Sequence, residues 1–301
     1  MANRQAGERN YLYLGLGGLL LVALFIVFAY SSSPFQGCVG VVEISGPIVS
    51  QGSDATLFSD GIKGSETIAS EIESANERPD VKSVLVLIDS PGGSVVATRE
   101  IYDALMSVNK SKVAYIHELG ASGGYYVAAG TNYIMAHPDA ITGSIGARMT
   151  LADMSGLFSK IGYNETSIKS GAMKDMGTPS RTLSEGETAV LESIVNESFA
   201  EFRQAVIDGR GKRLDMIAFE QVLDARIMTG RQAKKIGLVD ETGDKKAAIK
   251  KAAELGGIKN NDPPVCELSK GGKRKGMLSS FSSEAVLAVL QKMGLPQLLY
   301  R

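Results

Sequence analysis

Cysteine, histidine and tryptophan are scarce in this sequence, which has two cysteines, two histidines and no tryptophan. Neither Cys38 nor Cys266 belongs to a C-x-x-C pair. This pattern excludes a disulfide framework, a thiolate zinc site and an iron–sulfur cluster, and leaves open only a single bridge between the two. A histidine-rich metal site is excluded for the same reason, and no H-E-x-x-H motif is present.

An excess of charge of either sign is also lacking. The 32 basic and 33 acidic residues give a formal net charge of −1. No global positive field is therefore available to hold phosphates, and nucleic acid is not expected as a partner. The length of 301 residues with 44% hydrophobic and 22% charged content is that of an ordinary globular protein and argues against disorder, collagen and coiled coil.

A long uncharged run lies near the N-terminus, over residues 11–30. As a helix it would be about 30 Å long, the thickness of a bilayer's hydrocarbon core. Arg4 and Arg9 precede the run and no basic residue follows it closely, so the positive-inside rule places the N-terminus in the cytoplasm and the rest outside. We expect an uncleaved anchor in contact with membrane lipid. A cleaved signal peptide is the alternative.

The soluble part alternates between strand and helix patterns. Ser94 is expected to cap a helix with apolar positions 101, 105 and 108, and Ser184 with Glu187 forms a capping box that opens a long amphipathic helix. This alternation predicts an α/β domain with mostly parallel strands. The other expected helices cover residues 125–130 and 150–161, and the expected strands cover residues 39–48, 83–89, 112–117, 133–136, 141–146 and 165–169.

The character of the chain changes near residue 260. Two prolines and a K-G-G-K-R-K run follow, and residues 270–301 contain six basic side chains and one acidic one. We expect a solvated basic tail with a short amphipathic helix that docks on the domain. Contact with anionic lipid or with the protein's own groove is the alternative.

A serine between glycines is the strongest chemical signal, in the G-A-S-G-G motif at residues 120–124. A strand-to-helix turn of this kind exposes the Ser122 hydroxyl beside backbone N–H groups, as oxyanion stabilisation requires. The order of residues does not fit an α/β-hydrolase, because His117 precedes the serine and His137 follows it too closely. A neutral lysine is then the remaining base, and Lys174 in a Gly- and Met-flanked segment is the candidate.

Five ordered blocks carry a closer resemblance. Together they resemble the signal peptide peptidase A family, the membrane-bound serine proteases of bacteria, in its short single-domain form. The resemblance covers roughly residues 39–256 and does not include the tail. The blocks are S-P-G-G-S at 90–94, G-A-S-G-G-Y-Y-V-A at 120–128, T-G-S-I-G at 142–146, S-G-x-x-K-D at 170–175 and T-G-R-Q-A-K-K-I-G-L-V-D at 229–240.

The resemblance implies a role for five residues. Ser122 would be the nucleophile, Lys174 the general base, and Ser144 the residue that orients the lysine. Gly93 and Gly123 would supply the oxyanion hole. Because a carboxylate beside the base would favour its protonated form, we expect the neighbouring Asp175 side chain to point away.

The resemblance also implies a fold, a location and an activity. The fold would be the Clp/crotonase-like spiral of β-β-α units. The protein would be a Ser-Lys endopeptidase of the bacterial inner membrane with a periplasmic domain. It would degrade signal peptides left in the membrane and other unfolded extracytoplasmic polypeptides, without cofactor or metal. A homo-oligomeric ring or dome is implied, in which neighbouring units contribute serine and lysine.

Two alternatives of other classes stay open, a non-catalytic membrane-anchored scaffold of the same fold and an acyl-CoA-type enzyme. The expected organisation is a cytoplasmic N-terminus (1–10), an anchor (11–30), a linker (31–38), a protease domain (39–258) and the basic tail (259–301).

Overall fold

The computed structural model describes residues 37–54 and 61–268. The chain divides into two units, Met1–Gly37 and Cys38–Arg301, and the second is a mixed α/β fold with a mostly parallel sheet. The expected anchor over residues 11–30 and the helix expected in the tail lie outside the described residues. Within the described part of the chain, no helix is both long and apolar enough to cross a membrane.

Three parallel strands form the centre of the sheet: β1 (Cys38–Ser45), β2 (Val81–Ser90) and β3 (Ser111–Ala121). The continuous apolar run of β2 is buried on both faces, from Ser83 to Ile88, as expected for a central parallel strand. The described sheet runs in the order β6-β5-β3-β2-β1-β8, and β4 pairs with both β3 and β7. All pairs are parallel except β5 with β6.

The shorter strands come mostly from the second half of the described chain. Each is two to four residues long, and they extend the sheet on both sides of the three longer strands. They are β4 (Tyr133–Ala136), β5 (Ile141–Gly143), β6 (Ile227–Thr229), β7 (Glu241–Thr242) and β8 (Val265–Glu267).

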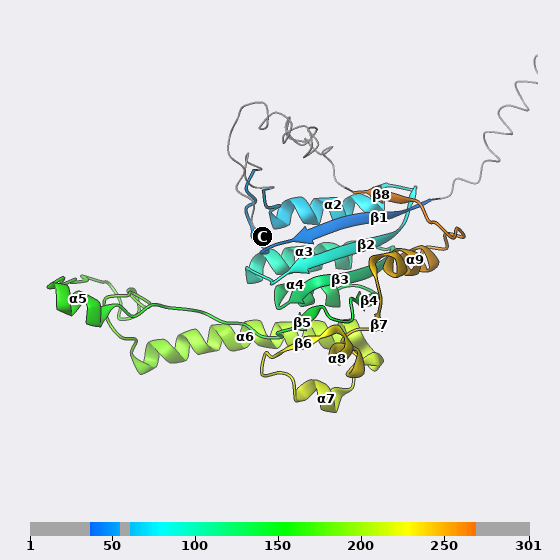
Figure 1. Cartoon of the computed structure of the whole chain (residues 1–301). Helices are drawn as coiled ribbons and strands as arrows, with labels where there is room; N and C mark the ends of the chain where they lie inside the picture. The colour runs from blue at the N-terminus through cyan, green and yellow to red at the C-terminus, as the bar shows by residue number, and fades with distance from the viewer. Residues whose placement is uncertain (1–36, 55–60, 269–301) are drawn as a thin grey trace, which may run out of the picture. The chain divides into compact units, whose positions relative to one another are not determined.

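Helices cover both faces of the sheet (Figure 1). The larger core lies between the sheet and α2 (Ser65–Glu77), α3 (Val95–Ser107) and α4 (Gly123–Ala129). On the other face α9 (Lys245–Leu255) packs its alanines against β2 and β3. The predicted cap of α3 is confirmed, because the Ser94 side chain accepts a hydrogen bond from the Ala97 N–H.

The longest helix, α6 (Glu185–Arg210), begins at the predicted capping box. Its C-terminal part packs Phe202 and Val206 into the core, while its N-terminal part is largely exposed. The chain then continues through a short 3-10 helix (Gly211–Arg213), α7 (Met216–Glu220) and α8 (Gly230–Lys235). A capping box of Thr229 and Gln232 opens α8.

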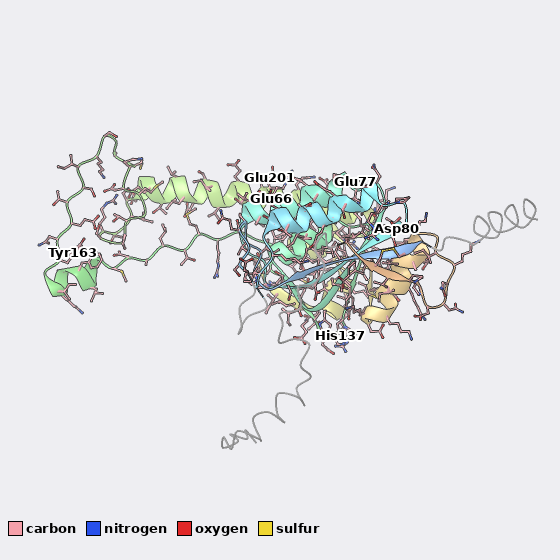
Figure 2. The ribbon with its side chains drawn as sticks, turned by 90° about the horizontal axis from the view of Figure 1, so that it is seen from above. Glu66, Glu77, Asp80, His137, Tyr163 and Glu201 are labelled. Carbon is pink, nitrogen blue, oxygen red and sulfur yellow. A yellow bond between two sulfur atoms is a disulfide. The ribbon has the colours of Figure 1, made fainter. Side chains whose placement is uncertain are left out.

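Residues 147–184, here called the arm, lie between β5 and α6 and include α5 (Ser155–Ile161). The arm lies at the N-terminal end of α6, away from the sheet (Figure 1), and Figure 2 shows Tyr163 far from Glu201 in a second view. It is tied together by hydrogen bonds of its own, such as Met154 N–H to Pro179 O at 2.8 Å and Thr182 Oγ1 to Asp153 at 2.8 Å.

Several predicted elements differ from those observed. The strand predicted over residues 165–169 is wrong, because that segment is irregular and fully exposed. Among the described strands, none pairs with this segment to satisfy its backbone groups. The helix predicted over 150–161 begins only at Ser155, and the strand predicted over 141–146 ends at Gly143.

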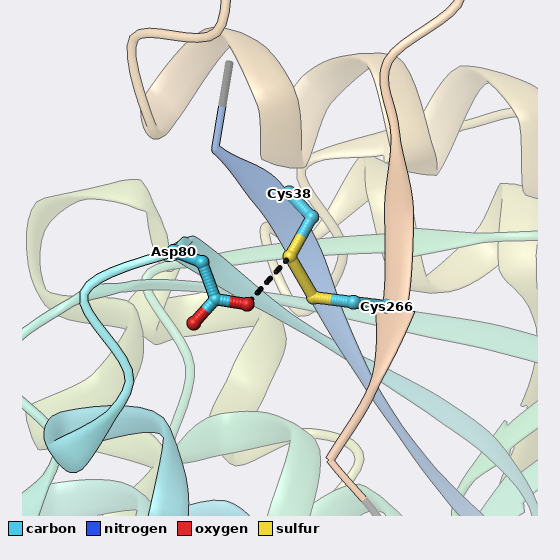
Figure 3. Close-up of side chains that lie close together, drawn as sticks. All are labelled: Cys38, Asp80 and Cys266. Carbon is cyan, nitrogen blue, oxygen red and sulfur yellow. Dashed lines mark hydrogen bonds between the residues drawn. A yellow bond between two sulfur atoms is a disulfide. The ribbon is translucent and has the colours of Figure 1, made fainter. Parts of the chain in front are cut away.

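The last described strand, β8, lies in the segment assigned above to the tail. It pairs with β1, and Leu268 is buried beyond it, so the folded core extends past residue 258. The single bridge left open by the sequence is present between Cys38 and Cys266. Figure 3 shows this disulfide beside the Asp80 carboxylate, which lies 3.7 Å from the Cys38 Sγ.

Candidate active site

Ser122 occupies the junction between β3 and α4. Its backbone has φ 52° and ψ −123°, a conformation that costs a residue with a side chain free energy and persists only where neighbours impose it. Here the Ser122 N–H donates to the Gly143 O at 2.9 Å, and the Ser122 O accepts from the Tyr125 and Tyr126 N–H groups, each at 2.9 Å. The serine is therefore held on a sharp strand-to-helix turn, the arrangement of a nucleophile.

Two free backbone N–H groups lie beside this turn. Among the described residues, neither the Gly93 nor the Gly123 N–H has a hydrogen-bond acceptor. An ideal Cβ at Gly123 would lie 3.3 Å from the Gly93 nitrogen, and one at Gly92 would lie 2.5 Å from the Gly123 nitrogen. The two amides are thus close together next to Ser122, as an oxyanion hole requires.

The glycine loop itself is fixed by the segment that follows β1. The Ile48 N–H donates to the Gly92 O, and the Ser94 N–H donates to the Ile48 O, both at 2.9 Å. A Cβ at Gly93 would lie 2.0 Å from the Ile48 O, and Gly92 has φ 91°. Glycine is required at both positions, at one for close approach and at the other for its backbone conformation.

A pocket of about 350 Å³ opens beside Ser122. One end contains the serine with Gly93 and Gly123, and the remaining walls come mainly from α3, α4 and α6. The other lining residues are Val95, Thr98, Arg99, Tyr126, Gly146, Ala147, Ile194, Glu197, Ser198, Glu201 and Phe202. The cavity is therefore suited to a side chain of a bound peptide.

Lys174 is not among the residues that line this pocket. It lies exposed in the arm, where its N–H donates to the Gly171 O at 3.1 Å. The neighbouring Asp175 accepts hydrogen bonds from Lys169 at 2.5 Å and from Arg181 at 2.8 Å. The structure of one chain thus brings Ser122, Gly93 and Gly123 together and leaves Lys174 apart from them.

Ser144 follows β5, next to the end of β3. Like Ser122 it has φ 52°, and its N–H donates to the Arg226 O at 2.9 Å. The residue before it, Gly143, provides the carbonyl that holds the Ser122 N–H. Ser144 is therefore one residue away from the carbonyl that binds the Ser122 N–H. The Ser144 side chain does not line the pocket.

The sequence reasoning missed the pocket walls. Ile194 and Phe202 are part of the predicted long amphipathic helix without any further role, and Thr98, Arg99, Glu197 and Glu201 belong to no motif. The available signal was spacing, because positions 194, 197, 198, 201 and 202 fall on one face of a helix. The spacing does not reveal that this face is turned toward Ser122.

Comparison with known proteins identifies the family of the chain. The family model described as Peptidase family S49 matches residues 104–259, which include Ser122, Ser144 and Lys174. The chain belongs to Peptidase family S49. This membership supports a serine peptidase.

Relatives extend the match beyond the family model. A protein of Methanocaldococcus jannaschii assigned as a protease, MJ0651, is 38% identical over 62% of this chain and 60% of its own length. A protein of Enterococcus faecium assigned as signal peptide peptidase SppA is 30% identical over 84% of this chain and 76% of its own. The match thus spans less than two thirds of the first relative.

A solved structure shares the fold. The S97A mutant of 1510-N, described as a membrane-bound stomatin-specific protease, has a TM-score of 0.52 to this chain at 16% identity. The match covers 78% of this chain and 99% of the other. At this identity the likeness concerns the fold alone.

Proposed function

We propose that the chain is a serine endopeptidase in which Ser122 is the nucleophile and Lys174 the general base. The observation that carries the proposal is the strained turn that holds Ser122 beside two N–H groups without acceptors. In the proposed reaction, the Ser122 oxygen attacks a peptide carbonyl carbon and its proton passes to the lysine amine. The Gly93 and Gly123 N–H groups stabilise the oxyanion.

The second half of the reaction uses the same groups. The protonated lysine gives its proton to the leaving peptide amine, and an acyl-enzyme ester remains on Ser122. The now neutral lysine then takes a proton from water as the water oxygen attacks the ester carbon. When the ester bond breaks, the lysine returns this proton to the Ser122 oxygen, and the new carboxylic acid leaves and ionises. Ser144 is proposed to orient the lysine amine, since it follows the residue that holds the Ser122 backbone.

We infer that Lys174 reaches Ser122 from a second copy of the chain. In one chain Lys174 is exposed on the arm and away from the pocket. The arm and the nearby part of α6 also expose large apolar side chains that would gain free energy by burial. These residues are Met149, Leu151, Met154, Leu157, Ile161, Tyr163, Ile168, Met173 and Val190. A homo-oligomeric ring or dome would bury these side chains, and it would also bring Lys174 of one copy to Ser122 of the next.

The architecture supports assignment to the Clp/crotonase-like spiral. Successive strands β1, β2 and β3 are followed by helices α2, α3 and α4 on one face of a mostly parallel sheet. The nucleophile lies at the start of one such helix, α4. We propose that the chain is a single unit of this spiral, with the arm as the part that meets a neighbour.

We also propose that the enzyme acts at a bacterial membrane. The uncharged run over residues 11–30 is the expected anchor. Substrates would be extended peptides, such as signal peptides left in the membrane and other unfolded polypeptides, that bind along the groove as an added strand. A second groove of about 620 Å³, between residues 147–151 and α6, adjoins the pocket at Ala147 and would lengthen this binding surface.

Labelling with a fluorophosphonate tests the proposed chemistry. We expect covalent modification of the protein at Ser122, which Ser122→Ala abolishes and Lys174→Ala slows strongly, because an unassisted serine hydroxyl is a weak nucleophile. Labelling that persists in Ser122→Ala, or a rate unaffected by Lys174→Ala, would contradict the dyad. A non-catalytic scaffold would show no labelling at all.

A further inference from the structure

The pocket beside Ser122 has a defined relation to the scissile bond, if the proposed function holds. Ser122 and the two glycines whose N–H groups have no acceptor are among its lining residues. A carbonyl carbon attacked by Ser122 must lie beside them. The side chain of the residue that carries this carbonyl, directly before the scissile bond, then enters the pocket.

The side chains that line the pocket include two carboxylates, Glu197 and Glu201, and one basic group. Arg99 is the one basic residue of its lining, and two carboxylates already engage it, Asp103 at 2.8 Å and Glu201 at 3.2 Å. Glu197 also lines the pocket, and among the described residues it has no hydrogen-bond or ion-pair partner. Glu197 and Glu201 are also four residues apart on α6, a spacing at which like charges destabilise a helix.

Thr98 is also part of the pocket wall, but its hydroxyl is not. The side chain is only 4% exposed, and its Oγ1 has almost no solvent-accessible surface. This oxygen packs against Gly123, since a Cβ there would lie 2.5 Å from it. A side chain bound in the pocket therefore does not reach the Thr98 hydroxyl.

The rest of the pocket surface is apolar. Phe202 is buried at 4% exposure, and its ring centroid lies 4.8 Å from that of Tyr126. Val95 and Ile194 are exposed and also line the pocket. Such walls suit the methylene stem of a long side chain, while the carboxylate of Glu197 suits a cationic end.

We propose that the pocket selects lysine or arginine directly before the scissile bond, with Glu197 as the residue that determines this specificity. Lysine and arginine are the side chains that combine an apolar stem, a positive charge and several donors without any acceptor. A purely apolar side chain would fill the cavity but would leave the Glu197 carboxylate without an ion-pair partner. The inference rests on the proposed function and adds the substrate class.

Peptides that differ only in the residue before the scissile bond test the proposal on the full-length protein. We expect kcat/KM to be at least about tenfold higher for lysine than for norleucine, which has a similar stem without the charge. Glu197→Gln should reduce the ratio of lysine to norleucine toward one. Glu197→Lys should reverse the order of a lysine peptide and a glutamate peptide.

A matched control separates a local effect from a change in net charge. Glu77→Gln removes the same charge from an exposed position at the end of α2 (Figure 2) and should leave the ratio of lysine to norleucine as in the unmodified protein. Equal rates for lysine and norleucine, or a ratio unchanged by Glu197→Gln, would overturn the specificity proposal. Cleavage of the norleucine peptide in that case would still support the peptidase, whereas no cleavage and no labelling of Ser122 would contradict the proposed function itself.

Discussion

Ser122 and Ser144 share an unusual backbone. Both have φ 52°, and each donates its N–H to a carbonyl of a neighbouring strand or loop. Such conformations are uncommon outside glycine and cost about 1–3 kcal/mol each, so they persist only where the surrounding structure imposes them. That two of the serines implied by the motifs adopt this conformation indicates that β3 and β5 are arranged to present them.

Gly93→Ala tests the oxyanion hole. The added Cβ would lie 2.0 Å from the Ile48 backbone oxygen, so the loop must move and its N–H must leave its position. We expect a loss of about 10²–10³ in kcat, the effect of removing one oxyanion donor. Steady-state kinetics on a cleaved peptide measures it, with circular dichroism to show that the fold is retained.

Gly156→Ala is the matched control for that substitution. Gly156 lies in α5 with no atom near its missing side chain. Alanine there should leave kcat unchanged and stabilise the helix by up to about 1 kcal/mol. A Gly93→Ala enzyme as active as the Gly156→Ala enzyme would contradict the role of the Gly93 N–H.

At the residue scale the sequence predicts what depends on local chemistry. Ser122 and Gly123 could be predicted as candidates, because a turn that exposes a nucleophile needs small residues within a few positions. Thr98 and Glu197 could not, because their importance arises from α3 and α6 meeting at one pocket. No spacing along the chain records that a helix about 70 residues after Ser122 would face it.

Ion pairs connect parts of the arm with one another and with α6. Arg181 donates to Asp175 at 2.8 Å and to Glu187 at 2.5 Å, and so ties the arm to the first turn of α6. Hydrogen bonds from Arg181 and from the Ser184 N–H lower the pKa of Glu187 to about 2. Those from Arg181 and Lys169 hold the pKa of Asp175 well below its usual range.

Acid should loosen the arm before the sheet. Carboxyl groups with a lowered pKa in the folded state contribute stability above their ordinary pKa of about 4, and this contribution is lost as the pH falls toward the folded value. We expect amide hydrogen exchange in residues 147–184, corrected for intrinsic rates, to accelerate between about pH 4.5 and about pH 2. Strands β1 to β3 should stay protected.

Arg181→Gln provides the comparison for that experiment. Without the arginine the arm should exchange faster at neutral pH and respond less to acid. An arm whose exchange is the same at pH 7 and pH 3 in the unmodified protein would show that these ion pairs do not hold it.

At the element scale, helices with local signals were predicted well. The capping box of Ser184 and Glu187 and the cap at Ser94 are confirmed, because caps depend on residues three positions apart. The strand predicted over residues 165–169 failed because a strand depends on a partner that may lie anywhere in the chain. The three-residue β8 was missed for the same reason, since its partner β1 lies more than 200 residues earlier.

For the whole molecule, the disulfide joins the first strand of the sheet to the last. It links residues 228 positions apart, so it removes much conformational freedom from the unfolded chain. Cys266→Ser should lower the free energy of unfolding by about 2–5 kcal/mol, measured by the denaturant midpoint. Reductant should destabilise the unmodified protein by a similar amount and leave the variant unaffected. A reductant effect of equal size in both would show that the bridge is not its cause.

The arrangement of the proposed catalytic residues in the whole molecule determines whether one chain can be active. Ser122 lies at the pocket beside the Gly93 and Gly123 N–H groups, while Lys174 is exposed on the arm. If neighbouring copies exchange arms, each proposed site contains the serine of one chain and the lysine of the next. One mutated chain can then still offer its intact residue to its neighbour.

Mixing two inactive variants tests this arrangement. Ser122→Ala and Lys174→Ala proteins should each be inactive alone and should regain activity when they are assembled together. With random mixing at equal amounts, half of the chains keep the serine and half keep the lysine, so roughly a quarter of the interfaces should be complete. Peptide cleavage by the mixed oligomer should therefore approach about a quarter of the activity of the unmodified protein. If oligomers shown to contain both variants have no activity, serine and lysine must come from one chain, and the arm must then fold back toward its own pocket to bring Lys174 to Ser122.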